Sequence, residues 1–596
     1  MINKDKKRLR SRILLMILAV SSAIAFSEKQ AFAQANFKSF KVVVNSDRDE
    51  EIIPDEKLTL REAISVVNKT LPLAELSPEE RQQVSAIAKY DASRIEFDLP
   101  APVKIELQDL LPPLTSPGLT VDGTTHADYD ANNSATAEIP IPIPVVSLTP
   151  APDKDIFRGL TISGDRITVR GLSIYGFDRP HNPTDTTPGA DIVVSALLPA
   201  IAELELQTYP PQNVTIVDNW LGLPPDESLN EIPSNFGIWL FDGVKTKISR
   251  NRIYHHGGSG ILTSVDATKT EIEENIIVGN GLRGMPHAIY LEGKLEETRI
   301  VGNLLCGNDG SGIYLFKPEG KINILNNTIK FNGRRVPSAA IYLIGNGHQV
   351  IKNDISWQTG TGVSIAAYPQ SDRNLIENNA FQDLEGLSID LNTRNRTSKS
   401  FFKLGDGVNP IRNSGNRSRD KANRAINAPQ FLSEEFYLID GKVNIDGVAD
   451  PGSRVTLYRV EPDTPRDIKK RSPLATQSQG YGPLSQPLTT EIANKQGRFS
   501  FTLHILEPGT KISAIATKSN YGTSEPAFNA VVRSLDNAAT KNESAGSFPR
   551  CTTKPVAKVY EPPAKMEVEV IPPPQPSPPK RQAVKLNVPR NIRPLA

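Results

Sequence analysis

The chain has 596 residues, enough for several folded units. Its 68 Lys and Arg residues nearly balance 67 Asp and Glu residues, so the net charge of +1 argues against broad electrostatic capture of nucleic acid or of an anionic membrane surface. The only two cysteines, Cys306 and Cys551, exclude a thiolate metal cluster and imply no disulfide framework, and we expect them to remain unpaired.

Residues 1–33 have the pattern of a secretory signal peptide. A basic segment, KDKKRLRSR, precedes the apolar run Ile13–Phe26, and Ala31 and Ala33 form a cleavage site before Gln34. The alternative is an uncleaved anchor, but the run is shorter than the roughly twenty residues that span a bilayer. We expect an exported protein without a transmembrane segment after cleavage, in the periplasm, at the cell surface or outside the cell.

The stretch TLREAISVVN (59–68) predicts one short helix in a chain that otherwise reads as strands and turns. Thr59 and Glu62 have the spacing of a capping box, in which each side chain hydrogen-bonds to the backbone N–H of the other residue. One side of this helix is apolar, because Leu60, Ala63, Ile64 and Val67 fall at helical spacing.

Residues 151–403 repeat a pattern of two short strand signals about every 25 residues, which predicts a solenoid of strands. One marker is a segment such as GIWL, AIYL or GIYL, and the other is an Asn followed by apolar residues. We interpret these Asn side chains as a hydrogen-bonded structural ladder rather than as a set of ligands. The repeated residues are Asn219, Asn251, Asn275, Asn303, Asn327, Asn353 and Asn379.

These repeats resemble those of right-handed parallel β-helix proteins of the pectate-lyase-like superfamily. The upstream segment VVVNSDRDE…LTLREAISVVNKT is similar to the S-L-R-E-A-I opening module of secreted bacterial β-helix proteins. The resemblance implies a mainly β fold in which residues 34–150 form an N-terminal cap and the opening strands. A solenoid exposes apolar core and strand edges at its ends, so we expect the helix at 59–68 to be a lid.

Three further segments follow the predicted solenoid. Residues 404–431 resemble the linker of this family, but with few acidic residues, so we expect no calcium site there. Residues 432–534 alternate apolar and polar positions between turn signals, which predicts a small antiparallel sandwich similar to bacterial immunoglobulin-like surface modules. Residues 535–596 are rich in Pro and predict a disordered tail, either with a binding partner or without one.

Candidate catalytic residues are few and scattered. Arg283, His287 and Glu292 lie close together in the sequence and form a weak candidate carbohydrate site. His255 and His256 are adjacent, so on a strand they would point in opposite directions, which disfavours a metal site. Arg334 and Arg335 follow in a later repeat. Positions after the repeat markers show no row of carboxylates, and we expect neither a metal nor a cofactor.

Two hypotheses for function remain. The first is an exported, non-catalytic protein of the cell envelope or surface, whose β-helix rod, sandwich spacer and tail serve adhesion, glycan contact or scaffolding. The second is a polysaccharide lyase, hydrolase or epimerase that uses the long outer face of the β-helix. The expected partners are polysaccharides or envelope components, with no role for nucleic acid.

Overall fold

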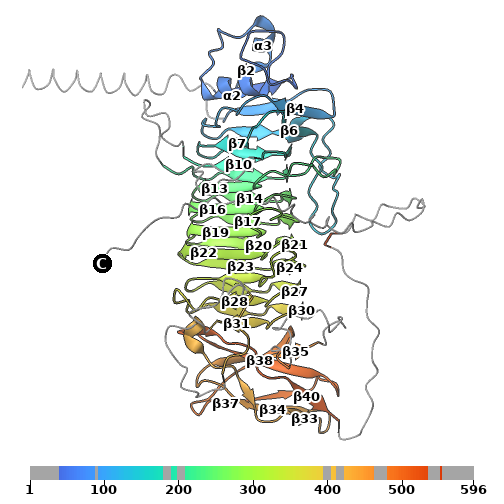
Figure 1. Cartoon of the computed structure of the whole chain (residues 1–596), viewed down its shortest axis with the longest axis vertical. Coiled ribbons are helices and arrows are strands. Elements are labelled where there is room, and N and C mark those ends of the chain that lie inside the picture. Colours follow the sequence, from blue (N-terminus) through green and yellow to red (C-terminus); the bar gives the residue numbers. More distant parts are fainter. Residues whose placement is uncertain are drawn as a thin grey trace, which may run out of the picture. The chain divides into compact units, whose positions relative to one another are not determined.

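The computed structural model describes residues 39–87, 92–178, 189–196, 209–392, 404–410, 422–461, 480–534 and 551–552. The predicted signal peptide (1–33) and most of the predicted tail (535–596) lie outside the described residues. The mainly β prediction is confirmed: three long sheets of stacked strands form a right-handed parallel β-helix, followed by a small sandwich (Figure 1).

The strands form three sheets, which we call A, B and C, and from Thr168 onward each coil contributes one strand to each sheet. Sheet A contains β1 (Phe40–Val44), β2 (Val84–Ala86), β3 (Arg94–Phe97), β5 (Thr120–Asp122), β8 (Thr168–Arg170), β11 (Thr215–Val217), β14 (Lys247–Ser249), β17 (Glu271–Glu273), β20 (Thr298–Val301), β23 (Ile322–Leu325), β26 (Gln349–Ile351) and β29 (Leu375–Glu377). Sheet B contains β4 (Val103–Leu107), β6 (Val146–Pro150), β9 (Leu172–Ile174), β12 (Trp220–Leu221), β15 (Arg252–Tyr254), β18 (Ile276–Val278), β21 (Leu304–Cys306), β24 (Thr328–Lys330), β27 (Asp354–Gln358) and β30 (Ala380–Leu384). Sheet C contains β7 (Arg158–Ile162), β10 (Ala190–Val194), β13 (Ile238–Asp242), β16 (Ile261–Asp266), β19 (Ile289–Lys294), β22 (Ile313–Glu319), β25 (Ile341–Leu343), β28 (Val363–Ile365) and β31 (Ile389–Leu391).

The core follows from the register of these strands. In sheet A, Ile248 pairs with Ile272 and Ile272 with Ile300, so the same apolar side chain recurs at the same inward position. All three are fully buried. Since neighbouring side chains of a strand point to opposite faces, the residues on either side of each Ile face outward. The sheets therefore present an apolar interior and three distinct outer faces.

The repeated Asn residues form a continuous ladder at the turn between sheets A and B. The amide of Asn303 donates to Asn327 Oδ1 at 2.9 Å, and the backbone N–H of Asn303 donates to the same oxygen, also at 2.9 Å. Equivalent bonds link the whole series, and every member is at most 1% exposed. The series comprises Asn219, Asn251, Asn275, Asn303, Asn327, Asn353 and Asn379.

The N-terminal end is covered by α2 (Leu60–Asn68), with α3 (Pro78–Gln82) nearby in the chain. Both hydrogen bonds of a capping box are present: Thr59 Oγ1 accepts from the Glu62 N–H, and Glu62 Oε2 accepts from the Thr59 N–H. The apolar side of α2 belongs to the same buried cluster as the solenoid core. Arg61 pairs with Asp49 at 2.7 Å and anchors the cap. Strand β2 runs antiparallel along β1 at the edge of sheet A.

A sandwich of two sheets follows the β-helix. One sheet contains β32 (Gln430–Phe431), β34 (Val443–Val448) and β37 (Arg498–Leu503). The other contains β33 (Glu435–Tyr437), β40 (Ala530–Arg533), β38 (Lys511–Lys518), β35 (Arg454–Val460) and β36 (Leu484–Ile492), with β39 (Gly522–Thr523) beside β38. Most pairs are antiparallel, but β33 and β40 are parallel.

The sandwich closes the other end of the solenoid, so it is not the spacer that the first hypothesis described. Tyr458, Leu484 and Ile515 of the sandwich belong to the β-helix core cluster. Gly522 forms a parallel bridge with Asn374, one residue before the last strand of sheet A. The physical reason is the one that applies to α2, because the last coil also exposes apolar core and strand edges. The strand signals alone could not reveal this contact.

The expectation of two unpaired cysteines is wrong. Cys306, at the end of β21 on the outer face of sheet B, forms a disulfide with Cys551. Cys306 is fully buried in an apolar cluster on this face, against which Cys551 and the segment around Ile139 and Ile143 pack. The 245 residues between the two cysteines concealed the pairing, because sequence distance gives no sign of spatial proximity.

Candidate functional site

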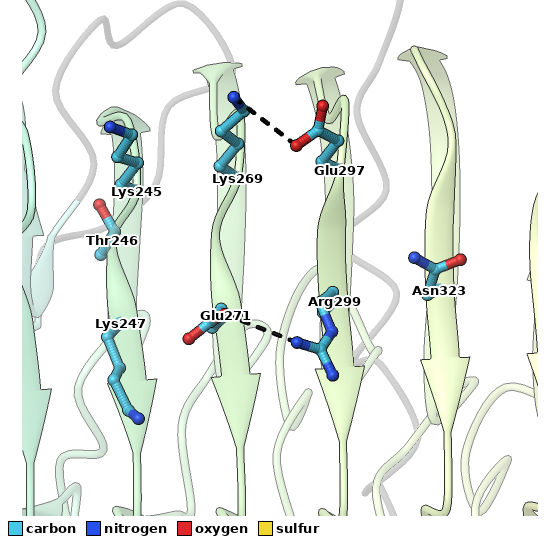
Figure 2. Close-up of a pocket in the computed structure, with 8 residues that line it drawn as sticks. All are labelled: Lys245, Thr246, Lys247, Lys269, Glu271, Glu297, Arg299 and Asn323. Carbon is cyan, nitrogen blue, oxygen red and sulfur yellow. Dashed lines mark ion pairs between the residues drawn. The ribbon is translucent and has the colours of Figure 1, made fainter.

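A polar groove lies on the outer face of sheet A and is a candidate binding site. It encloses about 510 Å³. Figure 2 shows that its lining comes from four successive strands and from the turns that precede them. The lining residues are Lys245, Thr246, Lys247, Lys269, Glu271, Glu297, Arg299 and Asn323.

Strand alternation and register place one row of these side chains. Lys247 on β14 pairs with Glu271 on β17, Glu271 with Arg299 on β20, and Arg299 with Asn323 on β23. Each is next to an inward Ile, so each must point to the solvent side of the sheet. The sequence therefore builds a straight polar row, one residue per coil, along the solenoid axis.

A second row lies at the turns that enter sheet A. Lys245, Lys269 and Glu297 have φ values of 57°, 58° and 62°, in the left-handed region. The backbone N–H of Lys245 donates to Thr268 O, and that of Lys269 donates to Glu296 O, each at 2.9 Å. These bonds from coil to coil hold the turns in stacked positions, so this row also follows the axis.

The groove contains two more cationic than anionic side chains. Lys269 pairs with Glu297 at 3.6 Å and Arg299 with Glu271 at 3.8 Å, and both pairs are largely solvated. Exposed pairs of this kind contribute little stability, so they exchange readily for a ligand. Lys245 has no carboxylate within ion-pair distance among the described residues.

The residues Arg283, His287 and Glu292 are not brought together as one site. Arg283 pairs with Asp178 at 2.7 Å, in the turn that leads to sheet C. His287 is 1% exposed, and its ring stacks on that of Tyr314 with centroids 4.2 Å apart. Glu292 lies further along β19, where its Oε2 is 3.5 Å from the Tyr290 hydroxyl.

Glu292 nevertheless has an altered environment. Burial raises its pKa above the usual range, whereas the hydrogen bond from Tyr290 and the charge of Lys317 lower it. Burial likewise raises the pKa of Tyr290 well above its usual value. A half-buried carboxyl group beside a tyrosine on an outer face is the one feature near β19 that suits proton transfer.

The adjacent histidines lie in the turn that follows β15, not on a strand as expected, because the strand ends at Tyr254 and His255 has a left-handed φ of 56°. Their side chains still have different surroundings. His256 is fully buried, with its Nε2 2.8 Å from Asp191 Oδ2 and its Nδ1 2.8 Å from Asn280 Oδ1. His255 is partly exposed, and burial together with the charges of His256, Arg283 and Arg334 lowers its pKa. Sequence reasoning did not identify Asp191, because it lies 65 residues before His256.

Arg334 and Arg335 both lie beside Asp309. Arg335 Nε is 2.9 Å from Asp309 Oδ2, and Arg334 Nε is 3.9 Å from Oδ1. Their placement is therefore that of ion-paired turn residues.

Across the described ranges, no group of three or more His, Cys, Asp or Glu side chains is arranged to hold a metal ion. In the same ranges, no helix is long and apolar enough to cross a membrane.

None of the residues that line the groove is among the site residues predicted from the sequence. The sequence pattern that produces the groove lies just before each ladder Asn, in the segments KTKISRN, TKTEIEEN, EETRIVGN and KINILNN. In each, a charged or amide side chain comes directly before a buried Ile. The two rows become apparent when the outward positions that precede each buried Ile are compared from one repeat to the next.

Comparison with known proteins bears on the fold. The family model described as "Right handed beta helix region" matches residues 211–329. No curated protein matched the chain. Among solved structures, the chain is similar to the A-module of the Azotobacter vinelandii mannuronan C-5 epimerase AlgE6, with 15% identity over 49% of this chain and 86% of that one and a TM-score of 0.28. It is also similar to the enzymatically active domain of tailspike protein 2 of bacteriophage CBA120, with 9% identity over 74% of this chain and 71% of that one and a TM-score of 0.26. A third similar structure is the periplasmic alginate epimerase AlgG, with 13% identity over 54% of this chain and 65% of that one and a TM-score of 0.24.

Proposed function

We propose that this protein is exported and acts without catalysis in the cell envelope or at the cell surface, where its β-helix contacts an extended glycan. The observation that carries this proposal is the groove on sheet A. Its two polar rows run along the solenoid axis over four and three coils, which suits a long polymer better than a compact ligand.

Two features support export. The first is the signal-peptide pattern of residues 1–33. The second is the disulfide between Cys306 and Cys551, because disulfides persist in oxidising compartments and are rare in the cytosol. Both features are independent of the groove, so they support localisation without bearing on the ligand.

The positions of the weak catalytic candidates favour binding over turnover. Arg283 is engaged by Asp178, and His287 is buried flat against Tyr314. Neither side chain is placed to act with Glu292 on one substrate atom, and general acid–base catalysis needs each group within hydrogen-bond reach of the proton it moves.

A panel of purified polysaccharides tests this proposal. The protein without residues 1–33 is incubated with acidic and neutral glycans, and both binding and release of unsaturated or reducing ends are measured. We expect binding without product release, and we expect binding to weaken with added salt because the groove is cationic. Product release at a rate that depends on enzyme concentration would contradict the non-catalytic reading.

The alternative function is a polysaccharide lyase, hydrolase or epimerase. The observation that favours it is Glu292, whose raised pKa suits a general acid or base. If this reading is correct, Glu292→Gln abolishes turnover in the same assay while leaving glycan binding at the sheet A groove intact. Lys317→Ala serves as a milder control, since it removes only a nearby charge that lowers the pKa of Glu292.

A further inference from the structure

The first row of groove side chains has a regular spacing as well as a definite order of charges. Its members are Lys247, Glu271, Arg299 and Asn323. Adjacent strands in a sheet lie about 4.8 Å apart, so Lys247 and Arg299 occupy positions about 10 Å apart along the axis. Between these two cations lies the carboxylate of Glu271, 39% exposed, and beyond them lies the neutral amide of Asn323. Over β14, β17 and β20 the charge of this row therefore alternates from one coil to the next.

A sugar unit in an extended glycan is about as long as the distance between two strands. A glycan that lies along the axis would therefore place about one sugar over each coil. Acidic groups are favoured over β14 and β20, where Lys247 and Arg299 lie. Over β17 an acidic group would face Glu271, whereas a neutral sugar can donate its hydroxyl protons to that carboxylate.

The second row makes β14 the strongest of these positions. Lys245 adds a cation in the same coil as Lys247 and has no ion-pair partner among the described residues. Lys247 itself pairs with Glu273 at 3.2 Å, and its side chain is 46% exposed. In the coil of β20 Glu297 accompanies Arg299, and in the coil of β17 Lys269 accompanies Glu271, so each of these two coils is balanced in net charge and they differ only in the charge of their first-row residue.

We infer that the groove selects a glycan that carries an acidic group on alternate sugars, with neutral sugars between them. This inference rests on the proposed glycan contact and specifies its ligand. Glu271 is the residue that determines specificity, because it disfavours polymers in which every sugar is acidic. Selectivity of this kind uses a repulsive contact against the wrong ligand as well as attractive contacts to the right one.

Three probes of equal length test the inference by calorimetry: hyaluronan oligosaccharides, which alternate acidic and neutral sugars, oligogalacturonate, which is acidic at every sugar, and a neutral cello-oligosaccharide. We expect hyaluronan to bind about tenfold more tightly than oligogalacturonate, because the latter meets the Glu271 carboxylate. Glu271→Gln should raise the affinity for oligogalacturonate about fivefold or more and leave hyaluronan nearly unchanged.

Glu96→Gln is the matched control, since Glu96 is paired with Lys41 in the same sheet but lies on β3, outside the groove. It should change neither affinity. Equal affinity of the wild-type protein for the two acidic probes, or an unchanged preference in Glu271→Gln, would overturn the inference while leaving the proposed glycan contact standing. Failure of all three probes to bind would overturn the glycan contact itself.

Discussion

Single residues determine this fold where a polar side chain is fully enclosed. Asn303 both accepts from Asn275 and donates to Asn327, and its amide also donates to Ile272 O at 2.9 Å. A shorter or apolar side chain would leave several of these groups buried without partners. This explains why Asn recurs at the same turn in the coils from Asn219 to Asn379.

We expect Asn303→Ala to lower the free energy of unfolding by about 2 kcal/mol or more, because each buried group left unpaired costs about 1–3 kcal/mol. Thermal unfolding followed by calorimetry measures the change. Asn323→Ala, at an outward position of β23, is the control and should have little effect. Similar losses in the two variants would contradict a structural role for the ladder.

A second prediction concerns the buried carboxyl groups where the β-helix meets the sandwich. Burial and the neighbouring Asp406 raise the pKa of Asp390 well above its usual value, and burial and Asp390 do the same for Glu525. A carboxyl group with a raised folded-state pKa stabilises the fold at low pH, and that stability is lost as pH rises toward the folded pKa.

The melting temperature should therefore fall as pH rises above the usual carboxyl range of about 4. Asp390→Asn should partly flatten this dependence and raise the melting temperature at the high end of the pH series, while Glu525 still titrates. The check is a set of thermal melts across that series for both proteins. A variant that loses stability equally at every pH would indicate a steric role instead.

Among the helices and strands, features that depend on residues close together in the sequence can be predicted, whereas contacts between distant segments cannot. The helix over 59–68 and its capping box are local, and the structure has α2 at 60–68 with both capping bonds. The apolar positions that repeat in phase predict the stacked core. By contrast, the closure of the last coil by Tyr458 and the pairing of His256 with Asp191 join distant segments. No periodic pattern encodes such contacts.

The closure of the solenoid by the sandwich leads to a prediction for one element. Tyr458, on β35, is 1% exposed and packs into the β-helix core. We expect Tyr458→Ala to cost about 3–5 kcal/mol, which is typical when a large buried aromatic side chain is removed. It should also increase aggregation, because it weakens the cover over exposed strand edges. Light scattering during heating measures this effect, and Tyr437→Ala, at a half-exposed position of β33, is the control.

At the scale of the whole molecule, the disulfide links the residues that follow the sandwich back to sheet B. Cross-linking two residues 245 positions apart restricts the unfolded chain, which stabilises a protein by about 2–5 kcal/mol. We expect Cys551→Ser to lower the melting temperature and to remove any further effect of a reducing agent. A wild-type melt that is insensitive to a reductant able to open the bond would contradict this role.

Cross-linking with mass spectrometry gives a direct test of the proposal that an extended glycan lies in the groove on sheet A. An acidic glycan oligosaccharide with activated carboxyl groups forms amide bonds to lysines that lie beside it. We expect cross-links at Lys245, Lys247 or Lys269, which line the groove, and we expect them to be lost when excess unmodified glycan competes. Cross-links confined to Lys294 or Lys317, on the strands of sheet C, would contradict it.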